Sequence, residues 1–117
     1  MEAGTLNLTI RRGVSFGPVA ITCLGTDGQP LPLAGWAAFA QMRQSPDDPV
    51  LLDFAPVIAA DDAAGLVTFP VVDYATTAAL QDGVYFWDLI LQTAEGRRLD
   101  PSISGTVTVS TPLTQPT

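Results

Sequence analysis

The chain has 117 residues, which is enough for one folded domain and too few for two. Acidic residues outnumber basic ones by 12 to 5, the formal net charge is −7, and every basic residue is an arginine. This balance argues against direct binding to nucleic acid, because a protein that neutralises phosphates needs a cationic surface.

The single cysteine, Cys23, cannot form a disulfide within the chain. It alternates with Val19 and Ile21, so we expect it to be a small buried hydrophobic residue rather than a reactive thiol. No stretch approaches the roughly 20 apolar residues of a membrane-spanning helix, and residues 1–4 do not begin a signal peptide. We therefore expect no membrane insertion, and synthesis and assembly in the cytosol.

In the first half of the chain, alternating apolar and polar residues predict strands at residues 6–10, 16–24 and 35–43. Turn signals follow the first two, at residues 11–13 and 25–30. The third strand would put Trp36, Ala38, Ala40 and Met42 on one face and Ala37, Phe39, Gln41 and Arg43 on the other. Its alanines also permit a helix, but Gly35 and the short span between turns favour a strand.

In the second half, residues 50–58 predict a strand that Pro56 interrupts, which indicates an edge strand or a bulge. A turn at residues 61–65 and a strand at residues 66–69 follow. Residues 73–80 lose the alternation, and Asp73 is placed to cap a short helical turn. After a hairpin at residues 93–96, residues 103–109 predict the last strand, so the domain spans residues 1–110 and residues 111–117 form an extended, mobile arm.

Residues 83–91 predict the central strand. Four large apolar residues share one face of it, as a core-facing strand requires: Tyr85, Trp87, Leu89 and Leu91. The other face carries Val84, Phe86, Asp88 and Ile90, which is unusually apolar for a surface that meets water.

Seven short strands, with one helical turn before the sixth, predict an all-β fold that is an antiparallel sandwich of two sheets. We expect its immunoglobulin-like form, in which residues 35–43 and 83–91 are neighbours in one sheet and Trp36 packs inside. A small barrel is the alternative.

Four segments, in this order, resemble a known family: "LNLTIRRGVSF", "DGQPLPLAGWAAFAQMR", "GLVTFPVVDYATTAALQDGVYFWDLILQTAEGRR" and "GTVTV". The pattern is similar to small immunoglobulin-like structural proteins of tailed bacteriophages and prophages, in particular tail- and baseplate-associated proteins with a fold like the N-terminal domain of upper baseplate proteins. The resemblance implies a virion component, assembled in the host cytoplasm, that acts as an adaptor or decorating module. Its partners would be other virion proteins of the tail, baseplate or head, and several copies would be present in each particle.

The sequence departs from that family at Phe39, Phe86 and Ile90, where polar or charged residues are common. If residues 35–43 and 83–91 are neighbouring strands, these side chains form one apolar patch with Val84 on the outer face, flanked by Arg43 and Asp88. We interpret this patch as a docking surface for a virion protein. Two alternatives are that residues 31–33 or 112–113 cover it, or that the register is shifted by one residue, which would exchange the two faces.

Catalytic chemistry has little support in the sequence. The chain contains no histidine and no lysine, which removes the usual general base, a common metal ligand and the Schiff-base amine. Several acidic residues lie in turns, but their spacing matches neither a calcium-binding loop nor a required catalytic pair: Asp47, Asp48, Asp53, Asp61, Asp62 and Asp73. Arg11, Arg12, Arg97 and Arg98 are expected to be exposed flanks or ion-pair partners. We therefore expect no enzyme activity, cofactor or metal; the alternatives to a tail or baseplate module are carbohydrate adhesion at the host surface and capsid decoration.

Overall fold

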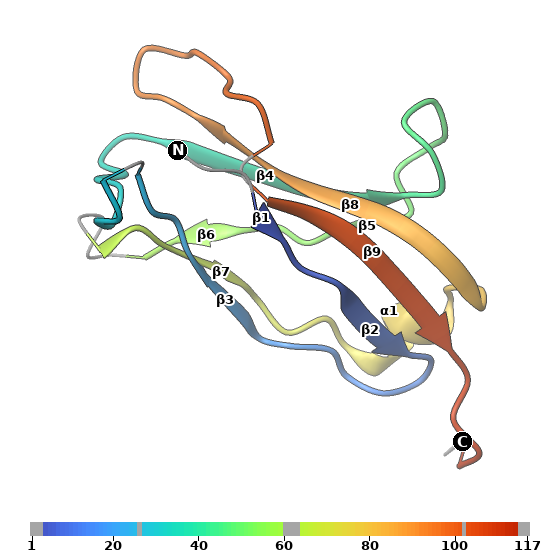
Figure 1. Cartoon of the computed structure of the whole chain (residues 1–117). Coiled ribbons are helices and arrows are strands. Elements are labelled where there is room, and N and C mark those ends of the chain that lie inside the picture. Colours follow the sequence, from blue (N-terminus) through green and yellow to red (C-terminus); the bar gives the residue numbers. More distant parts are fainter. Residues whose placement is uncertain (1–3, 26, 60–63, 102, 115–117) are drawn as a thin grey trace.

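The structure is a computed structural model and describes residues 4–25, 27–59, 64–101 and 103–114. These residues form nine strands and one short helix, and the strands make two sheets that lie as two layers (Figure 1). The larger sheet consists of β1 (Gly4–Thr5), β2 (Leu8–Arg11), β4 (Ala37–Arg43), β5 (Leu52–Asp53), β8 (Gly83–Gln92) and β9 (Ile103–Ser110). The smaller sheet consists of β3 (Val19–Thr22), β6 (Val57–Ile58) and β7 (Leu66–Phe69). The predicted two-sheet, all-β architecture is confirmed. The described residues form nine strands instead of the predicted seven, because a short extra strand, β1, precedes β2 and the segment of residues 50–58 contributes two strands. Most of the turn expected at residues 61–65 lies outside the described residues.

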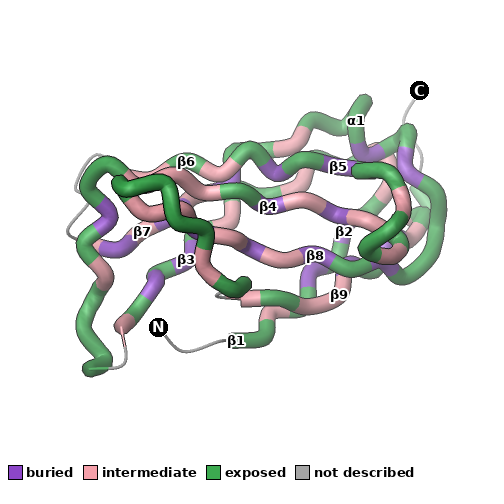
Figure 2. Tube along the Cα trace, turned by 90° about the horizontal axis from the view of Figure 1, so that it is seen from above, coloured by how far each residue is buried: buried purple, intermediate pink, exposed green. Residues whose placement is uncertain are grey.

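β8 is central to the larger sheet, with β4 on one side and β9 on the other, both antiparallel to it. The four residues predicted to face the core are all buried: Tyr85, Trp87, Leu89 and Leu91. On β4, Ala40 and Met42 are likewise buried, so buried and less buried positions alternate along both strands (Figure 2). The predicted register is therefore confirmed, and the one-residue shift is wrong. Trp36, just before β4, is partly buried against the core.

Aromatic side chains from three segments meet between the sheets. Phe69 of β7 stacks on Phe54 with ring centroids 5.1 Å apart, and the Trp87 ring of β8 meets both edge-on, at 5.6 Å from Phe69 and 6.0 Å from Phe54. Edge-to-face and offset contacts of this kind add to the stabilisation that comes from burying the rings. Cys23 is also buried, as predicted, and burial raises the pKa of its thiol.

The segment of residues 50–58 is not one interrupted strand. β5 pairs with β4 in the larger sheet, whereas β6 pairs with β7 in the smaller one, so the chain changes sheets between Asp53 and Val57. The Asp53 carboxylate accepts a hydrogen bond of 2.8 Å from the backbone N–H of Ala55, whose φ of +50° lies in the left-handed region. This local turn redirects the backbone, and both resulting strands are sheet edges, as Pro56 had suggested.

The first strands also differ from the expected antiparallel arrangement. β1 and β2 both pair with β9 in parallel, and the pairing is interrupted between them. At this break the indole N–H of Trp87 donates a hydrogen bond of 2.8 Å to the Leu6 carbonyl, and the Asn7 side-chain oxygen accepts one of 3.1 Å from the backbone N–H of Thr106. Gly105 lies beneath the break, and a Cβ on it would overlap the Leu6 carbonyl group. The register pairs Gly105 with Trp87, so the missing side chain makes room for the bond between Trp87 and Leu6.

Helix α1 (Tyr74–Ala78) closes the end of the sandwich beside β2 (Figure 1). It is shorter than the predicted 73–80, but its N-cap is Asp73 as expected. The fully buried Thr77 hydroxyl accepts a hydrogen bond from Gly13 N–H at 3.1 Å and lies 3.0 Å from the Val14 carbonyl oxygen, to which it donates. Arg12, expected to be an exposed flank or an ion-pair partner, donates to the backbone carbonyl of Ala78 at 3.0 Å. The helix is thus bonded to the loop that follows β2.

The expected C-terminal arm is described as far as residue 114. Thr111 is attached to the domain, because its hydroxyl donates a hydrogen bond of 2.7 Å to the Asp82 carboxylate. Leu113, two residues later, is fully exposed. Residues 115–117 of the expected arm lie outside the described residues.

Gly105→Ala should destabilise the protein, because the new methyl group would displace the Leu6 carbonyl and weaken its bond to Trp87. We expect the free energy of unfolding to fall by about 1–3 kcal/mol or more, measured by urea denaturation. Gly4→Ala is the matched control, since a Cβ there would meet only Ile103 side-chain atoms at 3.8 Å or more. Equal stability of the two variants would contradict this account of Gly105.

The cap at Asp73 should make stability depend on pH. Hydrogen bonds from the backbone and the side chain of Thr76 lower the pKa of Asp73 in the folded state. Its contribution is therefore fully present above the unfolded-state pKa, near 4, and is lost as the pH falls through the folded-state pKa. In thermal melts from pH 7 to pH 2, the gap in Tm between wild type and Asp73→Ala should narrow in acid. Asp73→Ser keeps a capping oxygen but does not titrate. The difference in Tm between Asp73→Ser and Asp73→Ala should therefore stay constant over the same pH range.

Candidate docking surface

The candidate surface is the outer face, by which we mean the side of β4, β8 and β9 turned away from the smaller sheet. Because β4 and β8 pair in a fixed register, their outward side chains form rows across this face. Phe39 is opposite Ile90, Gln41 is opposite Asp88, and Arg43 is opposite Phe86. Val84 lies one row further along, opposite Thr108 of β9.

All six residues predicted for the site lie on this outer face. Val84, Phe86 and Phe39 are 57%, 54% and 41% exposed, which is high for large apolar side chains in the middle of a sheet. The remaining three are partly buried: Ile90, Arg43 and Asp88.

The apolar residues do not form the single patch that the sequence predicted. Phe39 and Ile90 share one row, whereas Phe86 lies two rows away. The row between them is polar, with Asp53, Gln41 and Asp88 on neighbouring strands and Ser104 beyond. Asp88 therefore separates two apolar areas instead of flanking one, because residues 86 and 90 are four positions apart on the same strand.

Two arginines border the apolar areas, and both are bonded within the protein. Arg43 donates hydrogen bonds of 2.7 Å to the Asp48 carbonyl and 3.0 Å to the Gln41 side-chain oxygen. Arg98 donates one of 3.0 Å to the Gln92 side chain, and its guanidinium carbon lies 5.3 Å from the centre of the Phe39 ring. This distance is typical of a cation–π contact. Each guanidinium is thereby fixed beside an apolar area.

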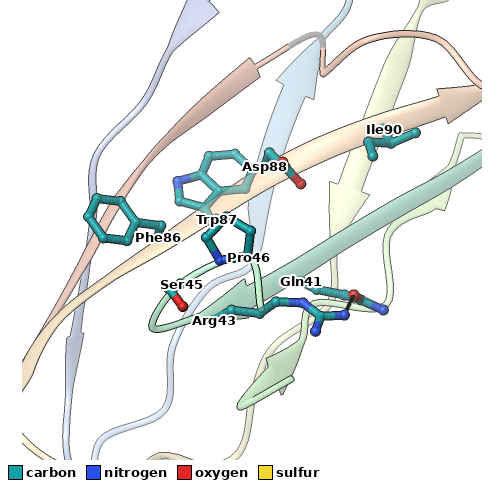
Figure 3. A pocket seen from close by; sticks show the side chains of 8 residues that line it. All are labelled: Gln41, Arg43, Ser45, Pro46, Phe86, Trp87, Asp88 and Ile90. Atoms are coloured by element: carbon teal, nitrogen blue, oxygen red, sulfur yellow. Dashed lines mark hydrogen bonds between the residues drawn. The ribbon is translucent and has the colours of Figure 1, made fainter. Parts of the chain in front are cut away.

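Among the described residues, two hollows lie on the outer face, and they share Gln41, Asp88 and Ile90 as a common wall. The first, of about 370 Å³, is lined by Gln41, Arg43, Ser45, Pro46, Phe86, Trp87, Asp88 and Ile90. In Figure 3, Phe86 and Ile90 lie on either side of Asp88 along β8, while Arg43 and Gln41 are hydrogen-bonded on the facing strand. The second hollow, of about 350 Å³, is lined by Phe39, Gln41, Asp88, Ile90 and Arg98. We call them the Phe86 hollow and the Phe39 hollow.

The two segments proposed to cover this face do not do so. Leu33 is 1% exposed within the core, and Leu31 packs against the same core. Leu113 is fully exposed and contacts neither apolar area. The loops that rise beside the outer face are instead the one after β4 and the one between β8 and β9 (Figure 1). Ser45 and Pro46 of the first, and Arg98 of the second, line the ends of the hollows without closing them.

Within the described residues, no three acidic, cysteine or histidine side chains are grouped as a metal site would require. Asp48 accepts a hydrogen bond of 2.9 Å from Ser45, and Asp53 and Asp73 accept from backbone N–H groups of their own turns. These three carboxylates therefore have local structural roles. Asp61 and Asp62 lie outside the described residues.

Sequence reasoning missed the polar part of the surface. Gln41 and Asp88 were each placed on an outward face, but only the strand register shows that they form one row between the apolar areas. Arg98 follows a hairpin and has no periodic signal, so its contact with Phe39 depends on how the loop folds back. The residues of this surface include no cysteine, methionine or histidine and match no sequence motif. Nothing in the sequence alone would therefore have identified the surface.

Comparison with models of known protein families and with curated proteins finds no match to this chain. In the described part of the chain the single helix has five residues, and no helix has the length and apolar character needed to cross a membrane.

Proposed function

We propose that this protein is a non-enzymatic structural module that docks on another protein through its outer face. The observation that carries the proposal is the exposure of Phe39, Val84 and Phe86 on strands whose opposite face is fully packed in the core. Side chains held this way cannot turn inward, so their apolar surface stays in water unless a partner covers it.

We further propose that the sandwich is immunoglobulin-like. Its sheet orders, β9-β8-β4-β5 and β3-β7-β6, correspond to the G-F-C-C′ and B-E-D arrangements of that fold. β2, the strand that precedes β3, pairs with β9 in the larger sheet. This is the main difference from the simplest immunoglobulin topology, in which the first strand belongs to the same sheet as B, E and D.

The biological setting that we propose is the virion of a tailed bacteriophage, with the protein as an adaptor or decorating module of the tail or baseplate. The support for this setting is the resemblance of the four sequence segments to such proteins. Phe86 is 54% exposed, Phe39 is 41% exposed and Ile90 is partly buried, so covering each would contribute only part of the roughly 1.5–3 kcal/mol that full burial of such a side chain is worth, before the cost of association. Several copies on one particle would add avidity, so a small surface suffices for stable attachment.

Phe86→Asp should abolish attachment while leaving the domain folded. Because Phe86 is 54% exposed, its replacement should change the Tm by only a few degrees, whereas docking would lose an apolar contact and would have to remove a new carboxylate from water. The measurement is quantitative mass spectrometry of purified particles assembled with the variant, with copy number expected to fall at least tenfold. Val57→Asp is the control, since Val57 is 55% exposed on β6 of the other sheet.

Normal incorporation of Phe86→Asp would contradict docking through the outer face. Absence of the wild-type protein from particles would contradict the virion setting itself. A reconstruction of the particle that shows the module at a distal tip with its outer face open would favour the second candidate, host-surface carbohydrate binding. That candidate has one supporting observation, namely the open Phe86 ring beside the polar side chains of Gln41 and Asp88.

A further inference from the structure

We propose that the partner presents a basic side chain to Asp88, between two apolar side chains that enter the Phe86 and Phe39 hollows. This inference rests on the proposed docking function and specifies the chemistry of the partner. It also predicts that the partner is a different protein and not a second copy of this chain.

The first step is the state of the charges on the outer face. Arg43 and Arg98 are occupied by bonds within the protein, to Asp48 and Gln41 and to Gln92 and Phe39. The Asp88 carboxylate differs, because no described residue donates a hydrogen bond to it or forms an ion pair with it. It lines both hollows. The unmatched charge of this surface is therefore negative and lies at its centre.

The second step is what docking does to that charge. A partner that fills both hollows must cover Asp88, which lines both of them. Docking therefore removes the Asp88 carboxylate from water. A buried carboxylate without a partner destabilises a complex strongly, whereas one that meets a cation and hydrogen-bond donors is tolerated and gives specificity. The occupant must therefore carry an arginine or lysine at this point.

The third step is spacing. Phe86, Asp88 and Ile90 point the same way from β8 at successive intervals of two residues, about 6.6 Å each. An extended partner segment that runs along β8 has the same spacing. It would place an apolar residue in one hollow, a basic residue two positions later at Asp88, and an apolar residue two positions after that in the other hollow.

A second copy of the chain does not meet these requirements. The central row carries Asp53 and Asp88 with no cation, and the two arginines on the face are already bonded. Stacking two such faces about a two-fold axis through this row would oppose carboxylates, and each chain has a net charge of −7.

The test uses the full chain, labelled with ¹⁵N, and three synthetic peptides of alternating sequence. The first is Thr-Leu-Thr-Arg-Thr-Leu-Thr, the second has Glu in place of Arg, and the third keeps Arg but has Ser in place of both Leu. NMR titrations are recorded with wild type, Asp88→Asn and the matched control Asp100→Asn, which removes the same charge at an exposed residue that lines neither hollow. We expect the Arg peptide to bind about tenfold more tightly than the other two, with shifts at Gln41, Asp88 and Ile90.

The expected tenfold preference for Arg over Glu should disappear in Asp88→Asn and persist in Asp100→Asn. A preference that survives in Asp88→Asn would overturn the proposal, because the overall negative charge would then explain it. Failure of all three peptides to shift outer-face resonances would overturn it as well. A wild-type dimer in sedimentation analysis that Phe86→Asp dissociates would replace the basic partner with a second copy.

The particle assay separates this inference from the proposed function. If Phe86→Asp is lost from particles while Asp88→Asn and Asp100→Asn are incorporated equally, docking through the outer face stands and the basic partner is wrong. If Phe86→Asp is lost and incorporation also falls at least fivefold for Asp88→Asn but not for Asp100→Asn, both stand.

Discussion

The hydrogen bond from the Trp87 indole to the Leu6 carbonyl is the contact on which the arrangement of the larger sheet depends. It joins the central strand to the first segment of the chain across β9, and it exists only because Gly105 has no side chain. The same Trp87 ring packs against Phe54 and Phe69, so one residue connects the edge of the larger sheet to the smaller sheet. A buried indole N–H without this acceptor would be costly, which makes the position of the first strand a condition of the core.

This internal order determines what the outer face offers a partner. Each outward residue of β8 alternates with one that is locked in the core, so rows of side chains are held at fixed spacing before any partner arrives. A surface that is already ordered loses little conformational entropy on binding. The specificity of binding then depends on the arrangement of two apolar areas and one carboxylate. A continuous exposed hydrophobic patch would instead favour aggregation.

The strands with clear alternation were predictable from sequence. Residues 83–91 and 35–43 showed a strict two-residue period. The core-assigned side chains of the first are all buried, whereas in the second Ala40 and Met42 are buried and Trp36 and Ala38 are partly buried. Asp73 was identifiable as a cap because its carboxylate acts on the backbone only three residues away. These features are local, so the residues that determine them are visible in a short window of sequence.

Features that depend on distant contacts were not predictable in the same way. Parallel pairing of β2 with β9 joins residues about a hundred positions apart, and alternation in a strand does not reveal its direction relative to a neighbour. The division of residues 50–58 between two sheets depends on a turn at Ala55, where alanine gives no signal for a positive φ. Likewise, an outward face can be read from one strand, but the polar row that divides it appears only when the register of two strands is known.

The parallel pairing of the first and last strands also has a mechanical consequence. β1 and β2 are the first described strands of the chain and β9 is the last, and because they run in the same direction, the chain enters β1 and leaves β9 at opposite ends of the sandwich (Figure 1). Tension between the ends pulls β2 and β9 past each other along their length, so the hydrogen bonds of this ladder are loaded together in shear and not opened one by one. The pair β4 and β8 lies outside this line of force. A pull along the chain is therefore resisted first by the β2–β9 ladder at the edge of the sheet.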